Sequence, residues 1–363
     1  MSAESRSPSI TKKGSSFRWW LGGLISLAAL YLALKGVEFG QTLDMLAGVR
    51  LPFAVLALLV SFFTLLAKAA RWVSLLSVAE NRAGSSRYID AFTSQSAGIF
   101  LNLFTPARLG DLARVYLFCA RQGGSRSQAL GTLAVEKLLD VVFLLASLVV
   151  WLPGMFYPDW FSQPLRAVLV MMGVISAACA LYVLRPDFWP QILRHLVRSI
   201  HLKWITWLFT RIELGMTSLH IFRNPRRLVV VLVWSALIWL FGVLTNLFVF
   251  WACQQPLDIE AAVFLLAVLQ IGVAAPSSPG RVGVFHYLTV LSLGVFGASQ
   301  EAGLAVGILL HLLVMFPIAL TGGFSMSLFT SHDWRELRRE KKMSFDPSIQ
   351  PQPEPNLSDG KTL

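Results

Sequence analysis

Two long apolar stretches of this chain are each interrupted by the same short polar frame. Pro106-Ala-Arg-Leu-Gly110 breaks the first stretch and Pro279-Gly-Arg-Val-Gly283 breaks the second. Both read Pro-x-Arg-apolar-Gly, with an apolar run on either side. Because proline and glycine end helices, each frame predicts two half-length helices joined by a turn. Paired interruptions of hydrophobic segments indicate a binding site at a repeat interface in a membrane.

The apolar runs around these breaks place the chain in a membrane. Of its 363 residues, 55% are hydrophobic and 14% are charged, whereas about a quarter of the residues in soluble domains are charged. Broken helices are tolerated at membrane depth only where protein or a wet cavity covers them. We therefore predict an all-α integral membrane protein with about six full transmembrane helices and two re-entrant broken-helix hairpins in a pseudo-inverted arrangement.

The domain boundaries follow from hydropathy and charge. A disordered, cytoplasmic N-terminal tail is expected over 1–16, the membrane domain over 17–330, and a basic, Pro-rich cytoplasmic tail over 331–363. Within the membrane domain, 185–227 predicts a basic connector on the membrane surface. The predicted full spans are 17–34, 52–76, 130–152, 164–184, 228–251 and 301–329, the last interrupted by Pro317 and Gly322-Gly323. The predicted hairpins are 88–119 and 261–296.

Lysine and arginine predict the orientation of the spans. With the N-terminus inside, the cytoplasmic side collects the basic residues of 71–87, 108–126, the connector and the C-terminal tail. The outer side receives little beyond Lys35 and Arg50. This asymmetry fits the positive-inside rule and predicts that both termini are cytoplasmic. It also predicts that the two hairpins enter the membrane from opposite faces.

Two carboxylates lie inside a predicted span. Glu136 and Asp140 are four residues apart and share one helical face, with Lys137 on a neighbouring face. One interpretation places them at the cytoplasmic interface, paired with Arg126 or Lys137. However, the residues from Asp140 to Leu152 are too few to cross a core of about 30 Å at about 1.5 Å per residue. The acids therefore lie below the headgroups and require buried partners.

The best partners for these acids are Arg108 and Arg114 of the first hairpin. A buried cluster of arginine and carboxylate can seat a lipid headgroup or relay protons. Arg108 has a simpler interpretation as a snorkelling arginine at the hairpin tip. As a ligand, its guanidinium would match phosphate bidentately beside the N–H groups of a helix start.

The other residues of the breaks have mainly structural interpretations. Gly110 and Gly283 are most simply turn residues with positive φ. His286 follows the second break, and a lone histidine on an apolar helix is more often a packing residue than a ligand. The predicted break residues are Pro106, Gly110, Pro276, Pro279, Gly280 and Gly283.

Several classes of function find no support in the sequence. The cysteines, Cys119, Cys179 and Cys253, have no metal or disulfide spacing. The sequence contains no phosphate-binding loop and no hydrolase or metalloprotease motif. We therefore predict no metal, no cofactor and no catalytic residue. The net charge of +11 fits cytoplasmic loops and anionic lipid better than nucleic acid.

Three separated segments, in order, resemble a known family. They are 104–114, 134–140 and 275–285, and they are similar to the flippase-like transmembrane region of lysylphosphatidylglycerol synthases. The likeness covers about 17–330. It implies a multi-pass protein of the bacterial plasma (inner) membrane that moves or binds a lipid, either an aminoacylated phosphatidylglycerol or a lipid of a glycan or hopanoid pathway.

The resemblance also implies site residues. Lys137 stands where the family usually has arginine, and His286 stands where its second break usually has glutamate, so a pH-sensitive imidazole takes the place of an acid. The predicted substrate-binding residues are Arg108, Asp111, Arg114, Glu136, Lys137, Asp140, Arg281 and His286. About thirty polar residues follow Phe329, too few for the aminoacyltransferase domain of the synthases, so we expect no lysyl transfer.

Three functions follow from these observations. The first is a lipid flippase or lipid transporter whose substrate is an anionic or lipid-linked species. The second is a membrane-embedded lipid-modifying enzyme that uses Asp111, Glu136, Asp140 or His286 as acid or base. The third is a non-transporting accessory subunit that anchors lipid or glycan biosynthesis enzymes. The first fits the paired breaks and the buried charges best.

Overall fold

A computed structural model describes residues 13–76, 85–105, 109–123, 125–151, 224–272 and 278–329, with isolated positions between 163 and 174. All regular structure in these ranges is helical, as predicted. The 331–363 tail, most of the 185–227 connector and most of the predicted 164–184 span lie outside the described residues.

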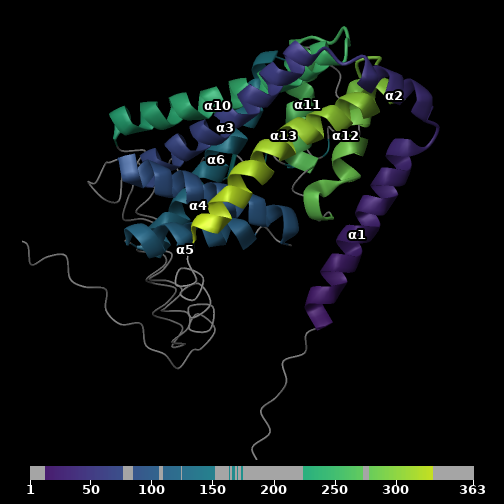
Figure 1. Cartoon of the computed structure of the whole chain (residues 1–363). Coiled ribbons are helices and arrows are strands. Elements are labelled where there is room, and N and C mark those ends of the chain that lie inside the picture. The colour runs from purple at the N-terminus through teal and green to yellow at the C-terminus, as the bar shows by residue number, and fades with distance from the viewer. Residues whose placement is uncertain are drawn as a thin grey trace, which may run out of the picture.

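The helices are arranged around both predicted hairpins (Figure 1). The first part of the chain forms α1 (Lys13–Leu34), α2 (Phe39–Ala47), α3 (Leu51–Leu76), α4 (Ser85–Phe104), α5 (Leu109–Gln122) and α6 (Arg126–Trp151). The second part forms α10 (Pro225–Ala252), α11 (Ile259–Gly272), the 3₁₀ turn η3 (Pro279–Arg281), α12 (Val284–Gly294) and α13 (Gln300–Leu328).

Two helix starts correct the predicted boundaries. α1 begins at Lys13, inside the 1–16 tail that was expected to be disordered; the rest of that tail lies outside the described residues. α10 begins at Pro225, inside the predicted connector. Asn224 caps α10 by accepting a hydrogen bond from the Arg227 N–H at 3.2 Å, and proline follows at the first helical position. These local signals start the helix earlier than hydropathy alone indicates.

In the described part of the chain, three helices are long and apolar enough to cross a membrane: α3, α10 and α13. The pair formed by 22–34 of α1 and by α2 would make a fourth span, although it bends by 86°. α6 matches a predicted span in position but carries Glu136, Lys137 and Asp140. The count of six full spans therefore stays a prediction.

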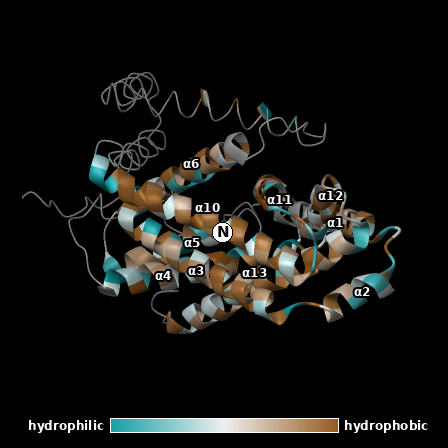
Figure 2. Cartoon of the chain, turned by 90° about the horizontal axis from the view of Figure 1, so that it is seen from above, coloured by the Kyte–Doolittle hydropathy of each residue, from teal (hydrophilic) through white to brown (hydrophobic). Residues whose placement is uncertain are grey.

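One face of α13 is suited to contact lipid. Leu312, Phe316, Leu320 and Phe324 follow one another at four-residue spacing and are 60%, 57%, 59% and 66% exposed. Apolar side chains at this spacing share one helical face. Hydrophobic residues also predominate along the neighbouring helices (Figure 2). An exposed apolar stripe of this length is stable in a hydrocarbon environment and would favour aggregation in water.

The first break joins α4 to α5 through a very close helix contact. A Cβ added at Gly110 would lie 2.0 Å from the carbonyl oxygen of Gly98. Gly110 lies in the first turn of α5 and not in a turn with positive φ, which corrects the prediction. Glycine is required there by the close approach of α4. Pro106, Arg108 and the residue between them lie outside the described part of the chain.

The second break contains the predicted left-handed backbone. Gly280 has φ 69° and Gly283 has φ 91°, as expected for turn glycines. Pro279 starts the 3₁₀ turn, whereas Pro276 lies outside the described residues. A Cβ at Gly283 would lie 2.2 Å from the carbonyl oxygen of Ser26 in α1. The two Pro-x-Arg-apolar-Gly frames thus place their final glycines in different conformations.

α13 is continuous through Pro317 and Gly322-Gly323, where an interruption was predicted. Thr321 stabilises the helix there by donating from Oγ1 to the carbonyl oxygen of Pro317 at 2.7 Å. The glycine pair serves packing instead, because a Cβ at Gly322 would lie 2.3 Å from Phe100 Cβ of α4. Small residues at such crossings allow membrane helices to approach closely.

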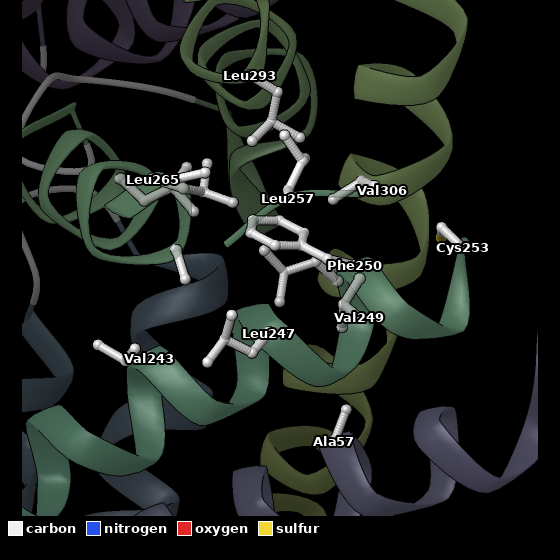
Figure 3. Packing of buried hydrophobic residues seen from close by; sticks show 14 of the residues in the cluster. Ala57, Val243, Leu247, Val249, Phe250, Cys253, Leu257, Leu265, Leu293 and Val306 are labelled. Atoms are coloured by element: carbon white, nitrogen blue, oxygen red, sulfur yellow. The ribbon is translucent and has the colours of Figure 1, made fainter. Parts of the chain in front are cut away.

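Buried apolar side chains fasten the second hairpin to the long helices. The largest cluster joins α10, α11, α12 and α13 to Ala57 of α3 (Figure 3). Phe250 of α10 lies at its centre and is fully buried. α11 is buried along almost its whole length. The second hairpin is therefore enclosed by protein on the sides that these helices cover.

The adjacent glycines of α13 allow a matched test of this packing. Gly322→Ala is expected to destabilise the protein by about 1–3 kcal/mol, because the added methyl overlaps Phe100. Gly323→Ala is the control, since no atom lies within 4 Å of its added Cβ. Thermal unfolding in detergent would measure both variants. Equal unfolding midpoints for the two would contradict the described contact of α4 with α13.

Candidate functional site

Four charged side chains from α3, α5 and α6 form an ion cluster, defined here as Arg71, Arg114, Glu136 and Asp140. Arg71 donates from Nη1 to Asp140 Oδ1 at 2.7 Å, and its Nη2 lies 3.4 Å from Glu136 Oε1. Arg114 donates from Nη2 to Glu136 Oε2 at 3.0 Å. Glu136 therefore lies between two guanidinium groups, and Arg71 bridges both carboxylates.

The ion cluster is buried except on one side. The side chains of Arg71, Arg114 and Glu136 are 1%, 3% and 7% exposed, whereas that of Asp140 is 26% exposed. Water or a ligand therefore has most access at Asp140. The predicted pairing with Arg114 is confirmed for Glu136. The alternative pairing is also present in weak form, since Lys137 Nζ lies 4.0 Å from Asp140 Oδ2.

Arg71 is the functional candidate that the sequence interpretation missed. The sequence interpretation counted it among the basic residues of the cytoplasmic side and gave it no role in the site. The last turns of α3 pack against other helices, so Arg71 is fully buried. The available signal was spacing: Lys68 and Arg71 are three residues apart inside an apolar run, and the acids of α6 are four apart. Each pair occupies one helical face.

The first hairpin positions Arg114 for its contact with Glu136. Gly98 and Gly110 bring α4 and α5 together, so that Arg114 packs against α4. There Arg114 donates from Nη1 to Gln95 Oε1 at 3.2 Å. Its guanidinium also lies 5.0 Å from the ring centre of Trp72, a favourable cation–π geometry. These contacts fix the arginine from three helices.

Asp111 has a structural role in the first hairpin. Asn102 of α4 donates from Nδ2 to Asp111 Oδ1 at 3.0 Å. The same amide accepts a hydrogen bond from the Gly110 N–H at 2.8 Å. Asn102 thus joins the two helices beside the break. Asp111 stabilises the start of α5, where a negative charge is favourable.

The ion cluster lies in an excess of positive charge. Lys68 is within electrostatic range of Asp140 and Glu136, and Lys137 is close to Asp140. Within the ranges that the structure describes, four basic side chains therefore surround two carboxylates. Both arginines also keep an unused donor, because neither Arg71 Nε nor Arg114 Nε has a hydrogen-bond partner in the described part of the chain.

The remaining predicted site residues lie elsewhere. Arg108 falls outside the described residues. Arg281 belongs to the 3₁₀ turn of the second break, and His286 to the first turn of α12. His286 lies 5.0 Å, ring centre to ring centre, from His311 of α13, a residue that the sequence interpretation missed. The two breaks are nevertheless near each other, since η3 contacts α4.

Metal ligands do not gather in the described part of the chain. No group of three or more histidine, cysteine, aspartate or glutamate side chains is close enough there to hold an ion. Cys119 and Cys253 are both buried. The chemistry that this site offers is charge pairing and hydrogen bonding, which suit an oxyanion.

Long apolar helices that enclose paired arginines and carboxylates define a polytopic membrane protein. The chain belongs to the family of the lysylphosphatidylglycerol synthase TM region, whose family model matches residues 19–322. The match covers both breaks and the ion cluster. It confirms the family resemblance seen in the sequence.

Two relatives from archaea are similar to this chain. UPF0104 membrane protein MJ1078 of Methanocaldococcus jannaschii is 25% identical over 243 residues, which are 67% of this chain and 100% of that protein. UPF0104 membrane protein PH1989 of Pyrococcus horikoshii is 23% identical over 324 residues, which are 82% of this chain and 93% of that protein. No solved structure shows a significant match.

Removal of Arg71 tests whether the ion cluster holds the helices together. Arg71→Gln should destabilise the protein by about 3–5 kcal/mol, because it leaves buried carboxylates short of a partner. Lys137→Gln should change stability by at most about 0.5 kcal/mol, since the Lys137 side chain is 49% exposed. Unfolding in detergent would compare the two variants. A wild-type midpoint for Arg71→Gln would show that the cluster is energetically unimportant.

Proposed function

We propose that this protein is a lipid flippase or lipid transporter that binds an anionic headgroup at the ion cluster. The observation that carries the proposal is the pair of buried arginines, Arg71 and Arg114, whose Nε donors have no partner in the described residues. A buried unpaired donor is costly, so its persistence points to a ligand. Phosphate suits two guanidinium groups because it accepts planar, bidentate hydrogen bonds.

The excess of positive charge supports an anionic ligand. Among the described residues, four basic side chains share the two carboxylates of the ion cluster, and charges in a membrane interior favour pairing with one another. A phosphodiester or phosphate headgroup would restore the balance. Asp140, the most exposed member, marks the side from which the headgroup enters. The acyl or polyprenyl chains would remain against the apolar helix faces.

The carboxylates allow the arginines of the headgroup site to exchange one partner for another. In the structure, Glu136 pairs with both arginines. An arriving headgroup would compete with Glu136 for one guanidinium, while the other arginine keeps the carboxylate paired. Each charge then has a partner before and after binding. Exchange of partners costs less than the creation of an unpaired charge in a low-dielectric interior.

Alternating access would use both hairpins. α13 contacts α4 of the first hairpin and α12 of the second, and η3 contacts α4. In this proposal the hairpins enter from opposite faces of the inner membrane, both termini are cytoplasmic, and the lipid passes between them. Broken elements of this kind line substrate paths in transporters with inverted repeats. Lipid or glycan biosynthesis enzymes would supply or consume the lipid.

Leaflet exchange in proteoliposomes tests this function. The lipid panel contains fluorescent phosphatidylglycerol, lysyl-phosphatidylglycerol, phosphatidylcholine and polyprenyl phosphate. Wild-type protein should accelerate exchange of at least one phosphate-bearing lipid. Arg114→Lys should slow it by about tenfold or more, because lysine keeps the charge but cannot hold Gln95 and Glu136 together.

A matched control variant separates the effect of the ion cluster from the effect of removing a positive charge elsewhere. Arg50→Gln should retain wild-type exchange, since the Arg50 side chain lies away from the ion cluster and donates to exposed Gln254 at 3.3 Å. Equal rates for wild type and Arg114→Lys across the whole panel would overturn the proposal. Mass analysis of the recovered lipids would reveal the alternative, a lipid-modifying enzyme, through a chemically changed product.

A further inference from the structure

A pair of histidines lies outside the proposed headgroup site, where α12, α13 and the second break meet. The rings of His286 and His311 are 5.0 Å apart between centres and almost perpendicular, at 79°. Phe285 packs on His311, with ring centres also 5.0 Å apart. Imidazole is the side chain that titrates in the physiological range, so two in contact are a candidate proton site.

His311 holds the turn of the second break. Its Nε2 lies 2.9 Å from the carbonyl oxygen of Gly280. Since a carbonyl only accepts hydrogen bonds, Nε2 carries the hydrogen, and Nδ1 carries the lone pair when the ring is neutral. Gly280 and Arg281 both have positive φ, at 69° and 61°. Arginine adopts this conformation at an energetic cost, so contacts with neighbouring helices must maintain the turn.

α1 holds the other side of the same turn. The Ser278 N–H donates to Ser26 Oγ at 2.7 Å. Gly283 packs so closely on Ser26 that a Cβ would not fit. The turn is therefore clamped between α1 and His311 of α13. A change in charge at His311 or its neighbour acts directly on one half of this clamp.

His286 fits the observed packing only as a neutral ring. It is 8% exposed, and its Nδ1 has no hydrogen-bond partner in the described residues. A cationic ring carries hydrogen on both nitrogens. Protonated His286 would thus bury an N–H without an acceptor and a charge without a counterion. The conformation described here is that of the unprotonated pair.

The charged surroundings of the pair are positive. Arg281 acts electrostatically on His311, and each histidine faces the other. The acids of the adjoining helices lie at the far ends: Glu301 in the first turn of α13 and Glu260 in the first turn of α11. On α4, Asp90 pairs with Arg121. α1 contributes the hydroxyl of Ser26, already used by the turn.

We infer that His286 and His311 form a proton-binding site that takes up one proton and, on doing so, releases the turn of the second break from α13. The proton comes from water and adds to an imidazole lone pair, which raises the charge of the pair by one. A second proton is opposed by the first and by Arg281. A proton on His286 leaves a buried N–H with no acceptor in the described residues, and the new charge repels Arg281 of the turn. These two effects oppose the hydrogen bond from His311 Nε2 to Gly280, which protonation itself does not break, and the turn and α12 separate from α13.

This inference deepens the proposed function, on which it rests for its biological role. If the second hairpin admits or excludes lipid, a proton at the pair couples lipid movement to pH. In this scheme the ion cluster binds the headgroup, and protonation of the histidines controls whether α13 holds the turn of the second break. The two sites use different residues, and they can be tested apart.

Cysteine accessibility measures release of the turn without any lipid assay. Val284→Cys is the reporter, because Val284 is 8% exposed and follows the turn directly; Val282→Cys is the reference, because Val282 is 44% exposed. The native cysteines, Cys119, Cys179 and Cys253, are first replaced by alanine. Labelling of full-length protein in vesicles with a water-soluble maleimide gives a rate for each position. The ratio of the two rates removes the pH dependence of the thiol itself.

Acidification should raise this ratio in wild-type background. Between about pH 8 and about pH 4 we expect an increase of about tenfold, as the pair passes from neutral to singly charged; burial and Arg281 disfavour the charged pair, so most of the increase falls at the acid end of this range. In the double variant His286→Gln/His311→Gln the ratio should change by less than about twofold, because neither amide titrates, while the amide at position 311 can still donate to Gly280. Each variant must elute as wild type in size-exclusion chromatography.

The outcomes separate this inference from the proposed function. A pH-dependent, histidine-dependent ratio supports the proton site even if no lipid is exchanged. A ratio that responds to pH equally in wild type and in the folded double variant overturns it, even if lipid exchange depends on Arg114. A ratio that does not respond to pH in wild type overturns it as well.

Discussion

The pairing of two arginines with two carboxylates is the constraint on which the arrangement of α3, α5 and α6 depends. In hydrocarbon, apolar helix faces gain little from contact with one another, since lipid tails solvate them equally well. A buried charge, in contrast, is not stabilised by lipid tails and needs a partner of opposite charge within the protein. The partners of Glu136 come from both α3 and α5, and the partners of Arg71 come from α6. The ion cluster therefore selects one relative position of these helices.

Close backbone contacts supply the precision that ion pairs lack. Gly98 meets Gly110, and Gly322 meets Phe100, at distances that exclude a side chain. α4 takes part in both contacts and also provides Gln95 for Arg114. The first hairpin is thus held in place by close glycine contacts on one side and by the charged side chain of Arg114 on the other. The same helix reaches the second break through η3, so the two broken elements share a support.

Hydropathy and helix-breaking residues predicted most of the fold, because a membrane allows few structures. The runs that became α3, α10 and α13 and both breaks were placed correctly. The role of Arg71 in the ion cluster was missed, since a sequence does not show which end of an apolar helix other helices will cover. Gly110 was misassigned for a related reason: a glycine needed for close packing looks like a glycine needed for a turn. His311 gave no local signal, because only the fold brings it to His286.

The continuity of α13 has a mechanical consequence. Gly307 of α13 packs against α12, whereas Gly322 packs against α4, so the two ends of one helix rest on different hairpins. Pro317 lies between these supports and lacks the N–H that would tie it to the preceding turn. Helices bend most readily at such a point. α13 can therefore bend at Pro317, so that the segment bearing His311 tilts while the segment packed on α4 stays in place.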